Sequence, residues 1–285
     1  KRKTFTIPSK IEIPTSLIKA SQNTSFVDFF INAFNLSTQE GQLLNIACLS
    51  HTNKELDQIF NTLVNQEMET RISIYAKCLN KTVREINRLL RNDTKLISYG
   101  ILDKEGNINQ DYFDCIFAKD FNILFSDVLK PDNKNEPYAL DTFSIKKDEQ
   151  EIALHLLHNS DSANILLYGT PGSGKTEYAR SLVKACGLTP LLFENELEVD
   201  SNEDNATDNA LCRLNCFLSL KNNVSVIIVE EAESLLSTNY FPIDDEEKKV
   251  TINRMLENNI NKVIWIVNNT NAIDESTLRR FTYSI

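Results

Sequence analysis

The sequence lacks a long hydrophobic run: no apolar stretch approaches the roughly 20 residues that a membrane-spanning helix needs. The first residues also lack the pattern of a secretory signal peptide. Six cysteines are scattered along the chain, and four fall in helix-like apolar positions, which favours reduced core thiols over a disulfide framework. We therefore expect a cytoplasmic protein with no membrane partner.

Glycine is scarce, with seven in 285 residues, yet three of them, Gly169, Gly172 and Gly174, fall within six positions. They lie in the stretch 165–176, where an apolar run leads into the phosphate-binding pattern G-x-x-x-x-G-K-[ST], and a helix-like segment follows. In this pattern backbone N–H groups surround a phosphate, lysine places its charge on the β and γ oxygens, and a hydroxyl binds Mg²⁺. We expect ATP or ADP to bind the following residues, with Thr176 also a ligand of Mg²⁺: Gly169, Thr170, Pro171, Gly172, Ser173, Gly174, Lys175, Thr176 and Glu177.

Composition and charge fit a chain of two globular parts. The hydrophobic content is 41% and the charged content 25%, and 285 residues are enough for two cores. The net charge of −10 is uneven: residues 1–130 hold 16 Lys and Arg against 15 Asp and Glu, and the remainder holds 14 against 25. The acidic balance argues against a general nucleic-acid coat, although a local basic face could still bind DNA.

Local patterns divide the chain into four parts. Residues 1–70 predict a helical bundle with an amino-terminal arm, and Ser37 with Glu40 has the spacing of a capping box. Residues 71–130 predict helices at 72–79 and 82–90, then a hairpin with its first strand at 95–102 and its turn at 103–107. Helix, helix and hairpin is the order of a winged helix. The proline-bracketed segment 131–140 predicts a linker, and residues 141–285 the nucleotide-binding domain.

The helix expected at 82–90 carries a row of basic residues along it and at its ends: Lys81, Arg84, Arg88 and Arg91 recur at spacings of three, four and three. Such a face on a winged helix can contact DNA phosphates. A charged stripe is also typical of a protein contact or a solvated helix face, so both interpretations stay open.

A second apolar run, at 224–229, ends at two carboxylates, Glu230 and Glu231. Following a phosphate loop in the same chain, such a pair predicts a Mg²⁺ site at the first acid and a base that polarises the attacking water at the second.

With these motifs the sequence resembles the AAA+ ATPase family. Residues 230–236, EEAESLL, resemble the family's D-E-A-[DE]-x-[LI] stretch, and residues 263–268, VIWIVN, resemble its fourth strand with the sensor-1 asparagine. We assign that role to Asn268, not Asn269 or Asn271, because the family places Leu/Ile-Asp five residues later, where Ile273 and Asp274 stand. Residues 278–281, LRRF, resemble the arginine-finger segment. The resemblance covers about residues 141–285, and the amino half resembles the helical and winged-helix extension of some bacterial members.

The resemblance implies a fold, a reaction and an assembly. The fold is an α/β phosphate-loop domain, the AAA+ large subdomain, whose parallel sheet has strand order 5-1-4-3-2, preceded by a mostly α-helical domain ending in a winged helix. Asn268 orients the attacking water, and Arg279 or Arg280 serves the site of a neighbouring subunit, so activity requires a homo-oligomeric ring, most often a hexamer. The cofactors implied are ATP and Mg²⁺, and the partner implied is a protein client that ATP hydrolysis remodels.

The sequence departs from the family pattern in two places. Glu230 stands where the family has aspartate, which places the carboxylate about one bond closer to the metal, and Mg²⁺ tolerates little change in geometry. The family's α-helical lid would begin where the given sequence ends. Two alternatives to a remodelling ATPase therefore stay open: a nucleotide-gated binding module with weak hydrolysis, and a DNA-associated ATPase acting through the basic face.

Overall fold

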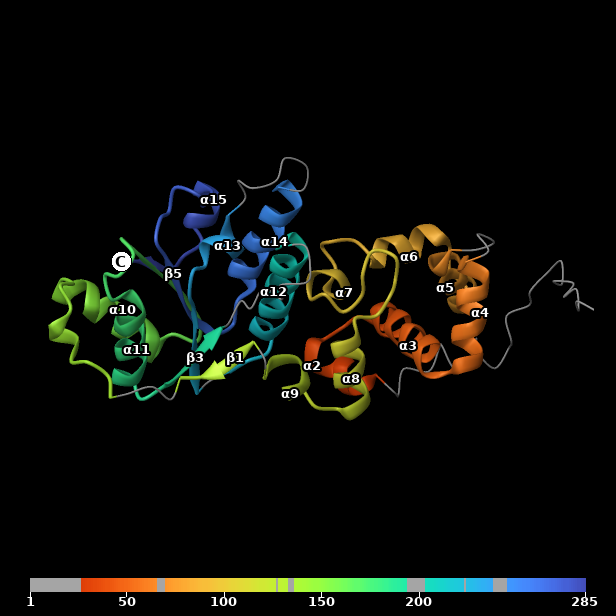
Figure 1. The fold of residues 1–285 in the computed structure, drawn as a ribbon, viewed down its shortest axis with the longest axis horizontal. Coiled ribbons are helices and arrows are strands. Elements are labelled where there is room, and N and C mark those ends of the chain that lie inside the picture. Colours follow the sequence, from red (N-terminus) through yellow and green to blue (C-terminus); the bar gives the residue numbers. More distant parts are fainter. Residues whose placement is uncertain are drawn as a thin grey trace, which may run out of the picture. The chain divides into compact units, whose positions relative to one another are not determined.

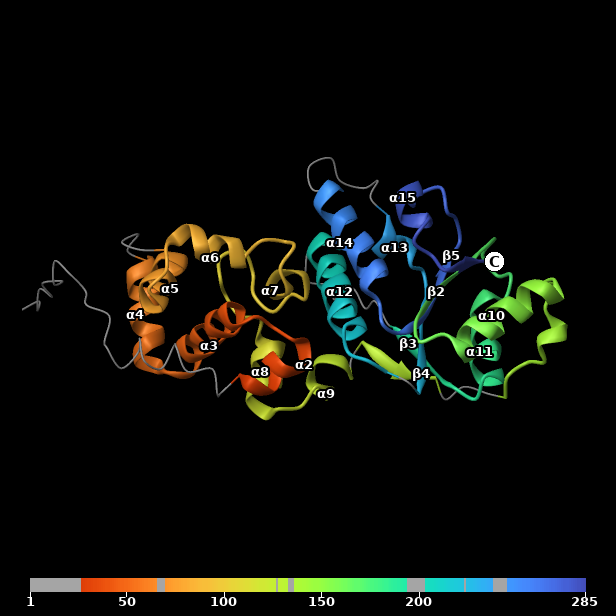
Figure 2. The ribbon, with the colours of Figure 1, turned by 180° about the vertical axis from the view of Figure 1, so that it is seen from behind.

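The structure is a computed structural model that describes residues 27–65, 70–126, 128–132, 136–193, 203–222, 224–237 and 245–285. The arm expected at the amino terminus lies outside these residues. The chain forms two compact units: an amino-terminal unit of Lys1–Leu96 with Ile101–Lys119, and a carboxy-terminal unit of Ile97–Gly100 with Asp120–Ile285. Figures 1 and 2 show the helical elements of the first and the sheet of the second.

The amino-terminal unit is helical. Its helices are α2 Asp28–Phe34, α3 Thr38–Thr52, α4 Lys54–Asn65, α5 Arg71–Leu79, α6 Val83–Leu89 and α8 Gln110–Ala118, with α7 Lys95–Ser98 at the division between the units. The expected capping box is confirmed on α3, where Ser37 and Glu40 exchange hydrogen bonds. Thr82 and Glu85 form a second one on α6. Each box satisfies N–H groups that the first helical turn leaves without partners.

The strand expected at 95–102 is wrong. Residues Lys95–Ser98 form the short helix α7, and the only pairing of the expected hairpin among the described residues is an isolated antiparallel bridge between Leu102 and Ile108. The turn between them is present and is closed by Gly106, whose φ is +84°. A Cβ at Gly106 would come within 2.8 Å of the Tyr75 ring, and the Tyr75 hydroxyl donates to the Gly106 carbonyl at 2.9 Å. Glycine is therefore required both by the backbone conformation and by the close approach.

The carboxy-terminal unit is built on a sheet whose strands, within the described ranges, follow the order β1-β3-β4-β5-β2-β6. Counted as the family counts them, from β2 as the first to β6 as the fifth, the parallel strands have the expected order 5-1-4-3-2, which confirms the fold class. The strands are β1 Leu129–Pro131, β2 Ala163–Tyr168, β3 Thr189–Phe193, β4 Ser225–Val229, β5 Lys262–Val267 and β6 Tyr283–Ser284. The helices are α9 Asn122–Phe125, the 3-10 helix η1 Leu140–Thr142, α10 Lys147–Asn159, α11 Lys175–Ala185, α12 Glu203–Leu218, α13 Glu233–Leu236, α14 Asp245–Asn258 and α15 Glu275–Leu278.

Strand β1 is an addition that the sequence did not predict. It pairs antiparallel with β3, with Pro131 opposite Leu191, and so forms one edge of the sheet. Proline is tolerated there because an edge strand leaves one side of its backbone unpaired. The segment interpreted as a linker thus begins inside the sheet.

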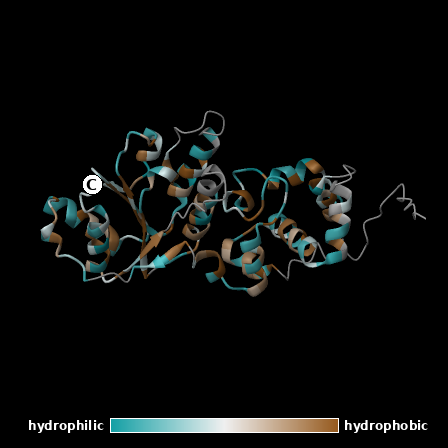
Figure 3. Ribbon diagram, viewed as in Figure 1, coloured by the Kyte–Doolittle hydropathy of each residue, from teal (hydrophilic) through white to brown (hydrophobic). Residues whose placement is uncertain are grey.

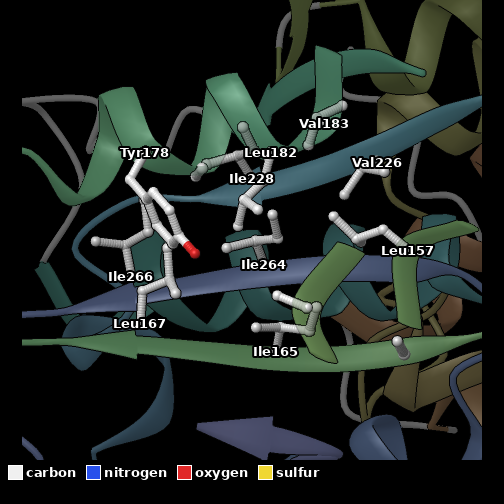
Figure 4. Packing of buried hydrophobic residues seen from close by; sticks show 13 residues of the cluster. Leu157, Ile165, Leu167, Tyr178, Leu182, Val183, Val226, Ile228, Ile264 and Ile266 are labelled. Carbon is white, nitrogen blue, oxygen red and sulfur yellow. The ribbon is translucent and has the colours of Figure 1, made fainter. Parts of the chain in front are cut away.

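Both faces of the sheet are buried. Alternate residues of β2, β4 and β5 pack with α10 and α11 into a core that includes Ile165, Ile228 and Ile264 (Figure 4). The intervening residues, among them Leu166 and Trp265, are buried on the opposite face, where α12, α13 and α14 lie in Figures 1 and 2. This explains why β2, β4 and β5 read as continuous apolar runs in the sequence, and the strands are mostly brown in Figure 3.

All six cysteines are free thiols, as expected, and Cys48, Cys78, Cys115 and Cys216 are buried. Burial raises the pKa of Cys48 to about 12 and that of Cys78 to about 11. In the part of the chain that the structure describes, no helix is long and apolar enough to cross a membrane.

Candidate functional site

The phosphate loop connects β2 to α11 at the carboxyl end of the sheet's parallel strands. Gly174 is the last residue before α11 and has a φ of +84°, a left-handed conformation that glycine adopts without strain. The first N–H groups of α11 lack partners within the helix, so this end of the helix can bind an anion. The local fold is therefore the strand, loop and helix that the sequence pattern requires.

Lys175 connects this loop to the neighbouring strand. Its ammonium group donates three hydrogen bonds, to the carbonyls of Gly169 and Thr170 at 2.8 and 2.9 Å and to Oδ1 of Asn268 at 3.0 Å. Asn268 directly follows β5, which pairs with β2 along its whole length. Lys175 and Asn268, which are 93 positions apart in the sequence, are thus joined by a direct hydrogen bond.

A cavity of about 400 Å³ lies over the loop. Thr176 and Glu230, the two residues expected to share Mg²⁺, both line it, and so do Glu231 and Asn268. Gly169 and Thr170 are not among its lining residues, and their carbonyls accept hydrogen bonds from Lys175. The full lining is Pro171, Gly172, Ser173, Gly174, Lys175, Thr176, Glu177, Glu230, Glu231, Ile266 and Asn268.

Glu231 has an unusual backbone. Its φ is +47°, in the left-handed region that non-glycine residues rarely adopt, and its side chain is exposed at the cavity. Its carbonyl accepts hydrogen bonds from the N–H and the hydroxyl of Ser234, which fix the turn after β4. Backbone strain of this kind clusters at functional sites.

A second cavity, of about 380 Å³, shares Ser173, Gly174 and Lys175 with the first. Its wall includes the aromatic rings of Phe143 and Tyr178, which pack edge to face with centroids 5.2 Å apart. The remaining lining residues are Thr142, Ser144, Ile145, Leu167, Tyr168 and Ile285. Apart from the three residues shared with the first cavity, its lining comes from separate segments that carry no motif, so the sequence pattern did not predict it.

Tyr178 is almost fully buried beneath this second cavity. Burial raises the pKa of its phenol to about 12, with smaller contributions from Glu149 and Tyr283. Its hydroxyl has no hydrogen-bond partner among the described residues.

Arg180 forms a buried ion-pair network on α11. Its guanidinium contacts the carboxylates of Asp132, which follows β1, and Glu177, which lines the first cavity. The Arg180 and Asp132 side chains are 10% and 1% exposed, so this pair is shielded from water. The network connects the edge strand β1 to the helix that begins at the phosphate loop. The i,i+3 spacing of Glu177 and Arg180 is typical of a helical pair, but sequence spacing gives no sign of the contact with Asp132.

The two arginines expected at the arginine-finger position differ. Arg280 donates to the Glu257 carboxylate at 2.7 Å and to the Ser276 carbonyl, so it is held within its own unit. Arg279 is exposed, and its side chain contacts no partner within the described ranges. Neither residue lines the cavity that contains Lys175.

Comparison with known proteins gives one family. The family model described as "ATPase family associated with various cellular activities (AAA)" matches residues 165–285. No curated protein matches the sequence. The match spans the phosphate loop, the acidic pair, Asn268 and both arginines.

The chain also matches parts of solved structures, among them the following two. One is the FIGL-1 AAA domain, with 17% identity and a TM-score of 0.41, where the match covers 58% of this chain and 59% of that one. This chain thus spans less than two thirds of that relative. The other belongs to the E. coli MS115-1 HORMA:CdnC:Trip13 complex, with 14% identity and a TM-score of 0.41, covering 55% and 67%. The family match, on a sheet with the expected strand order, identifies residues 165–285 as a domain of the AAA family of ATPases.

Proposed function

We propose that the chain binds ATP with Mg²⁺ and hydrolyses the bond to the γ-phosphate. One observation carries this proposal: the phosphate loop, the two carboxylates Glu230 and Glu231, and Asn268 line a single cavity. These side chains come from the carboxyl ends of three neighbouring strands, where ligands of open α/β sheets bind.

The residues of this cavity have distinct roles in the proposed reaction. Lys175 and the N–H groups at the start of α11 bind the β- and γ-phosphates, and Lys175 exchanges part of its present hydrogen bonding for phosphate oxygens. Glu231 accepts the proton of the water that attacks the γ-phosphorus, and Asn268 orients that water. The bond between the γ-phosphorus and the bridging oxygen breaks, and ADP and phosphate leave.

The donor set fits Mg²⁺. Thr176 and Glu230 offer a hydroxyl and a carboxylate, which are oxygen ligands of the kind that Mg²⁺ prefers. Among the described residues no cluster of three or more His, Cys, Asp or Glu could hold a metal, so phosphate oxygens and water must complete the shell. When bound, the ion would neutralise charge on the phosphates.

The second cavity supports a whole nucleoside triphosphate as the ligand. It adjoins the phosphate site at Ser173, Gly174 and Lys175 and offers the rings of Phe143 and Tyr178. Apolar pockets with aromatic walls suit a planar base, and a few polar groups at one end fix its orientation. Thr142 and Ser144 supply hydroxyl groups in its lining.

Hydrolysis is proposed to take place in a homo-oligomeric ring, a hexamer, that remodels a protein partner. Arg279 is the better arginine finger because it is exposed, whereas Arg280 is held by Glu257. Since neither arginine lines the cavity of its own chain, either would act on a neighbouring subunit, and a finger supplied in this way contributes about 10³- to 10⁵-fold to the rate.

Nucleotide binding and phosphate release in purified variants test the catalytic assignment. Lys175→Ala is expected to abolish measurable ATP binding. Glu231→Gln is expected to keep binding and lose about 10²- to 10⁴-fold in turnover. The exposed residues Lys147 and Glu151 give matched controls on α10, Lys147→Ala and Glu151→Gln.

Two outcomes would contradict the assignment. Unchanged ATP affinity in Lys175→Ala would remove the phosphate site from this loop. Tight ATP binding by the parent chain without any phosphate release in its assembled form would favour the nucleotide-gated binding module.

The arginines are separated by a second experiment. Arg279→Ala is expected to lower turnover about 10³-fold or more in the assembled protein, and Arg280→Ala to lower it less. Mixing the Arg279→Ala and Lys175→Ala chains should restore turnover, because each supplies the group that the other lacks. Failure of the mixture, with assembly confirmed by mass measurement, would contradict action between subunits.

The DNA-associated alternative rests on Lys81, Arg84, Arg88 and Arg91. Lys81 is half-buried, and the three arginines are exposed on and just after α6. Arg91 lies 3.7 Å from Asp93, and Glu85 stands on the same helix. Duplex binding that weakens steeply with salt would support this alternative, since phosphate contacts release counterions.

A further inference from the structure

Glu233 is a third acidic residue beside the proposed catalytic pair. It is the first residue of α13, and its carboxylate accepts a hydrogen bond from the backbone N–H of Asn268. Asn268 directly follows β5. The contact therefore joins the turn after β4 to the turn after β5.

The connection continues to the phosphate loop. Oδ1 of Asn268 accepts from the Lys175 ammonium group at 3.0 Å, and Lys175 also donates to the carbonyls of Gly169 and Thr170. Glu233, Asn268 and Lys175 thus connect the loops that follow β4, β5 and β2, which are adjacent in the sheet. Asn268 is the middle member, with its main chain held on one side and its side chain on the other.

Glu233 differs from the two acids before it. Glu230 and Glu231 line the cavity, whereas Glu233 is not among the lining residues. Its carboxylate instead accepts a hydrogen bond from the main-chain N–H of Asn268, at the end of β5. A charged acceptor makes this hydrogen bond stronger than one between neutral groups.

The turn that carries Glu233 is itself fixed to β5. The Ala232 N–H donates to the Ile266 carbonyl at 2.9 Å, and the Ser237 N–H donates to the Glu233 carbonyl at 2.8 Å. Ser237 also forms an antiparallel bridge with Ile273. Glu233 is thus presented to Asn268 from a rigid support.

We propose that Glu233 is a positioning residue that sets the orientation of Asn268 in the reaction, and this inference rests on the proposed ATP hydrolysis. The Asn268 side chain extends from a main chain that the Glu233 carboxylate holds, so a shift of that main chain would move the amide relative to Lys175. Without the Glu233 carboxylate the Asn268 N–H loses its partner and the strand end becomes free to shift. A displacement of about 1 Å in a catalytic group costs on the order of 100-fold in rate.

The test compares Glu233→Ala, Glu233→Gln, Asn268→Ala and the double variant Glu233→Ala/Asn268→Ala. Glu233→Ala is expected to lower kcat about 10- to 100-fold while the affinity for ATP stays within about threefold. Glu233→Gln should recover most of the rate, because its amide oxygen can accept the same hydrogen bond. In the Asn268→Ala background, removal of Glu233 should have little further effect, since residues that act as one unit are not additive.

Glu275 supplies a matched control. It is the exposed first residue of the equally short helix α15, its side chain contacts no partner in the described parts of the chain, and it does not line the cavity. Glu275→Ala is expected to leave kcat and ATP affinity unchanged.

A readout without turnover separates this inference from the proposed function. Hydrogen exchange of the Asn268 amide, measured by NMR on the folded chain, should be about tenfold or more faster in Glu233→Ala than in the parent. Unchanged exchange, a normal kcat in Glu233→Ala, or an undiminished effect in the Asn268→Ala background would each overturn the role of Glu233. If the parent chain never hydrolyses ATP, the proposed function is wrong. The exchange rate of the Asn268 amide still tests its contact with Glu233, because that measurement needs no turnover.

Discussion

The two units differ in how many polar side chains they bury. In the amino-terminal unit the core consists mostly of aliphatic residues, thiols and aromatic pairs such as Phe30 with Phe34 and Phe60 with Tyr75, and its buried polar residues within the described ranges are Asn45 and Ser50. In the carboxy-terminal unit the buried polar set is larger, and the following members form hydrogen bonds to side chains or backbone carbonyls, or pair as ions: Asp132, Gln150, Asn164, Arg180, Ser225, Asn259 and Asn261. A buried polar group must find its partner, whereas an apolar contact tolerates small shifts, so the second unit is held in one arrangement more strictly.

Buried asparagines form such specific hydrogen bonds at the end of the sheet opposite the phosphate loop. Asn164 of β2 accepts from Asn259 at 2.9 Å and from the Trp265 indole at 3.2 Å. Asn261, which precedes β5, donates to the carbonyls of Leu218 and Leu220 at 2.7 and 2.9 Å. The strands that carry the loops of the proposed site at one end are therefore fixed at the other by specific hydrogen bonds.

The largest expected effect on stability is at the buried ion pair. Asp132→Ala leaves the Arg180 charge buried without this partner, and removal of one member of such a pair costs about 3–5 kcal/mol. Chemical denaturation combined with hydrogen exchange should place the loss in the carboxy-terminal unit. The double variant Asp132→Leu/Arg180→Met is the control, expected to recover most of the loss because no lone charge remains. A cost below about 1 kcal/mol for Asp132→Ala would show that the pair is not shielded.

Asn261→Ala is expected to lower the free energy of unfolding by about 3 kcal/mol. The substitution leaves the buried carbonyl of Leu218 without this partner, together with the part-buried carbonyl of Leu220 and the part-buried N–H of Asn222. Thermal unfolding of the parent and variant gives the measurement. Asn258, exposed at the end of α14, provides the control Asn258→Ala, and equal effects at both positions would contradict the polar network.

Two glycines compare the units directly. Gly106→Ala should cost about 2–3 kcal/mol in the amino-terminal unit, because the residue has a positive φ and its Cβ would meet the Tyr75 ring. Gly187→Ala in the carboxy-terminal unit has a φ of +68° but an open Cβ position, so about 1 kcal/mol is expected. The difference in unfolding midpoint between the two variants measures the cost of the contact, and equal midpoints would show that the Tyr75 ring moves aside.

The smallest expected effect is the change in stability when a buried tyrosine loses its hydroxyl, and its sign differs between the two units. Tyr178→Phe removes a buried hydroxyl that has no hydrogen-bond partner among the described residues and should stabilise the protein by about 1 kcal/mol. Tyr75→Phe removes the bond to the Gly106 carbonyl and should destabilise it by about the same amount. A loss of ATP affinity in Tyr178→Phe would instead assign the hydroxyl to the nucleotide.

What the sequence could predict depended on whether a residue's role was local. The phosphate loop, the strand before the acidic pair and the Ser37 cap are each encoded within a few consecutive residues, and the structure has all three elements at the expected positions. The order of the parallel strands followed from the family resemblance, not from the residues alone. The partners of Lys175 and Glu233 lie 93 and 35 positions away at Asn268, and no spacing rule reveals such pairs.

Two local interpretations failed for physical reasons. The segment 95–102 is short and apolar, and such a run fits a buried helix turn as well as a strand, so periodicity could not distinguish them. The segment 131–140 was interpreted as a linker, but Pro131 belongs to β1, because the open side of an edge strand accommodates a residue without an N–H. In both cases tertiary packing decided the outcome.

The edge strand β1 also has a mechanical consequence. The chain must pass through Leu129–Pro131 on its way from the helical unit to the phosphate loop, and β1 runs antiparallel to β3. Tension between the two units would be borne in part by the hydrogen bonds of that ladder and would reach α11 through Asp132 and Arg180. A force on the helical unit would thus be transmitted to a side chain one helical turn from the residues proposed to bind phosphate.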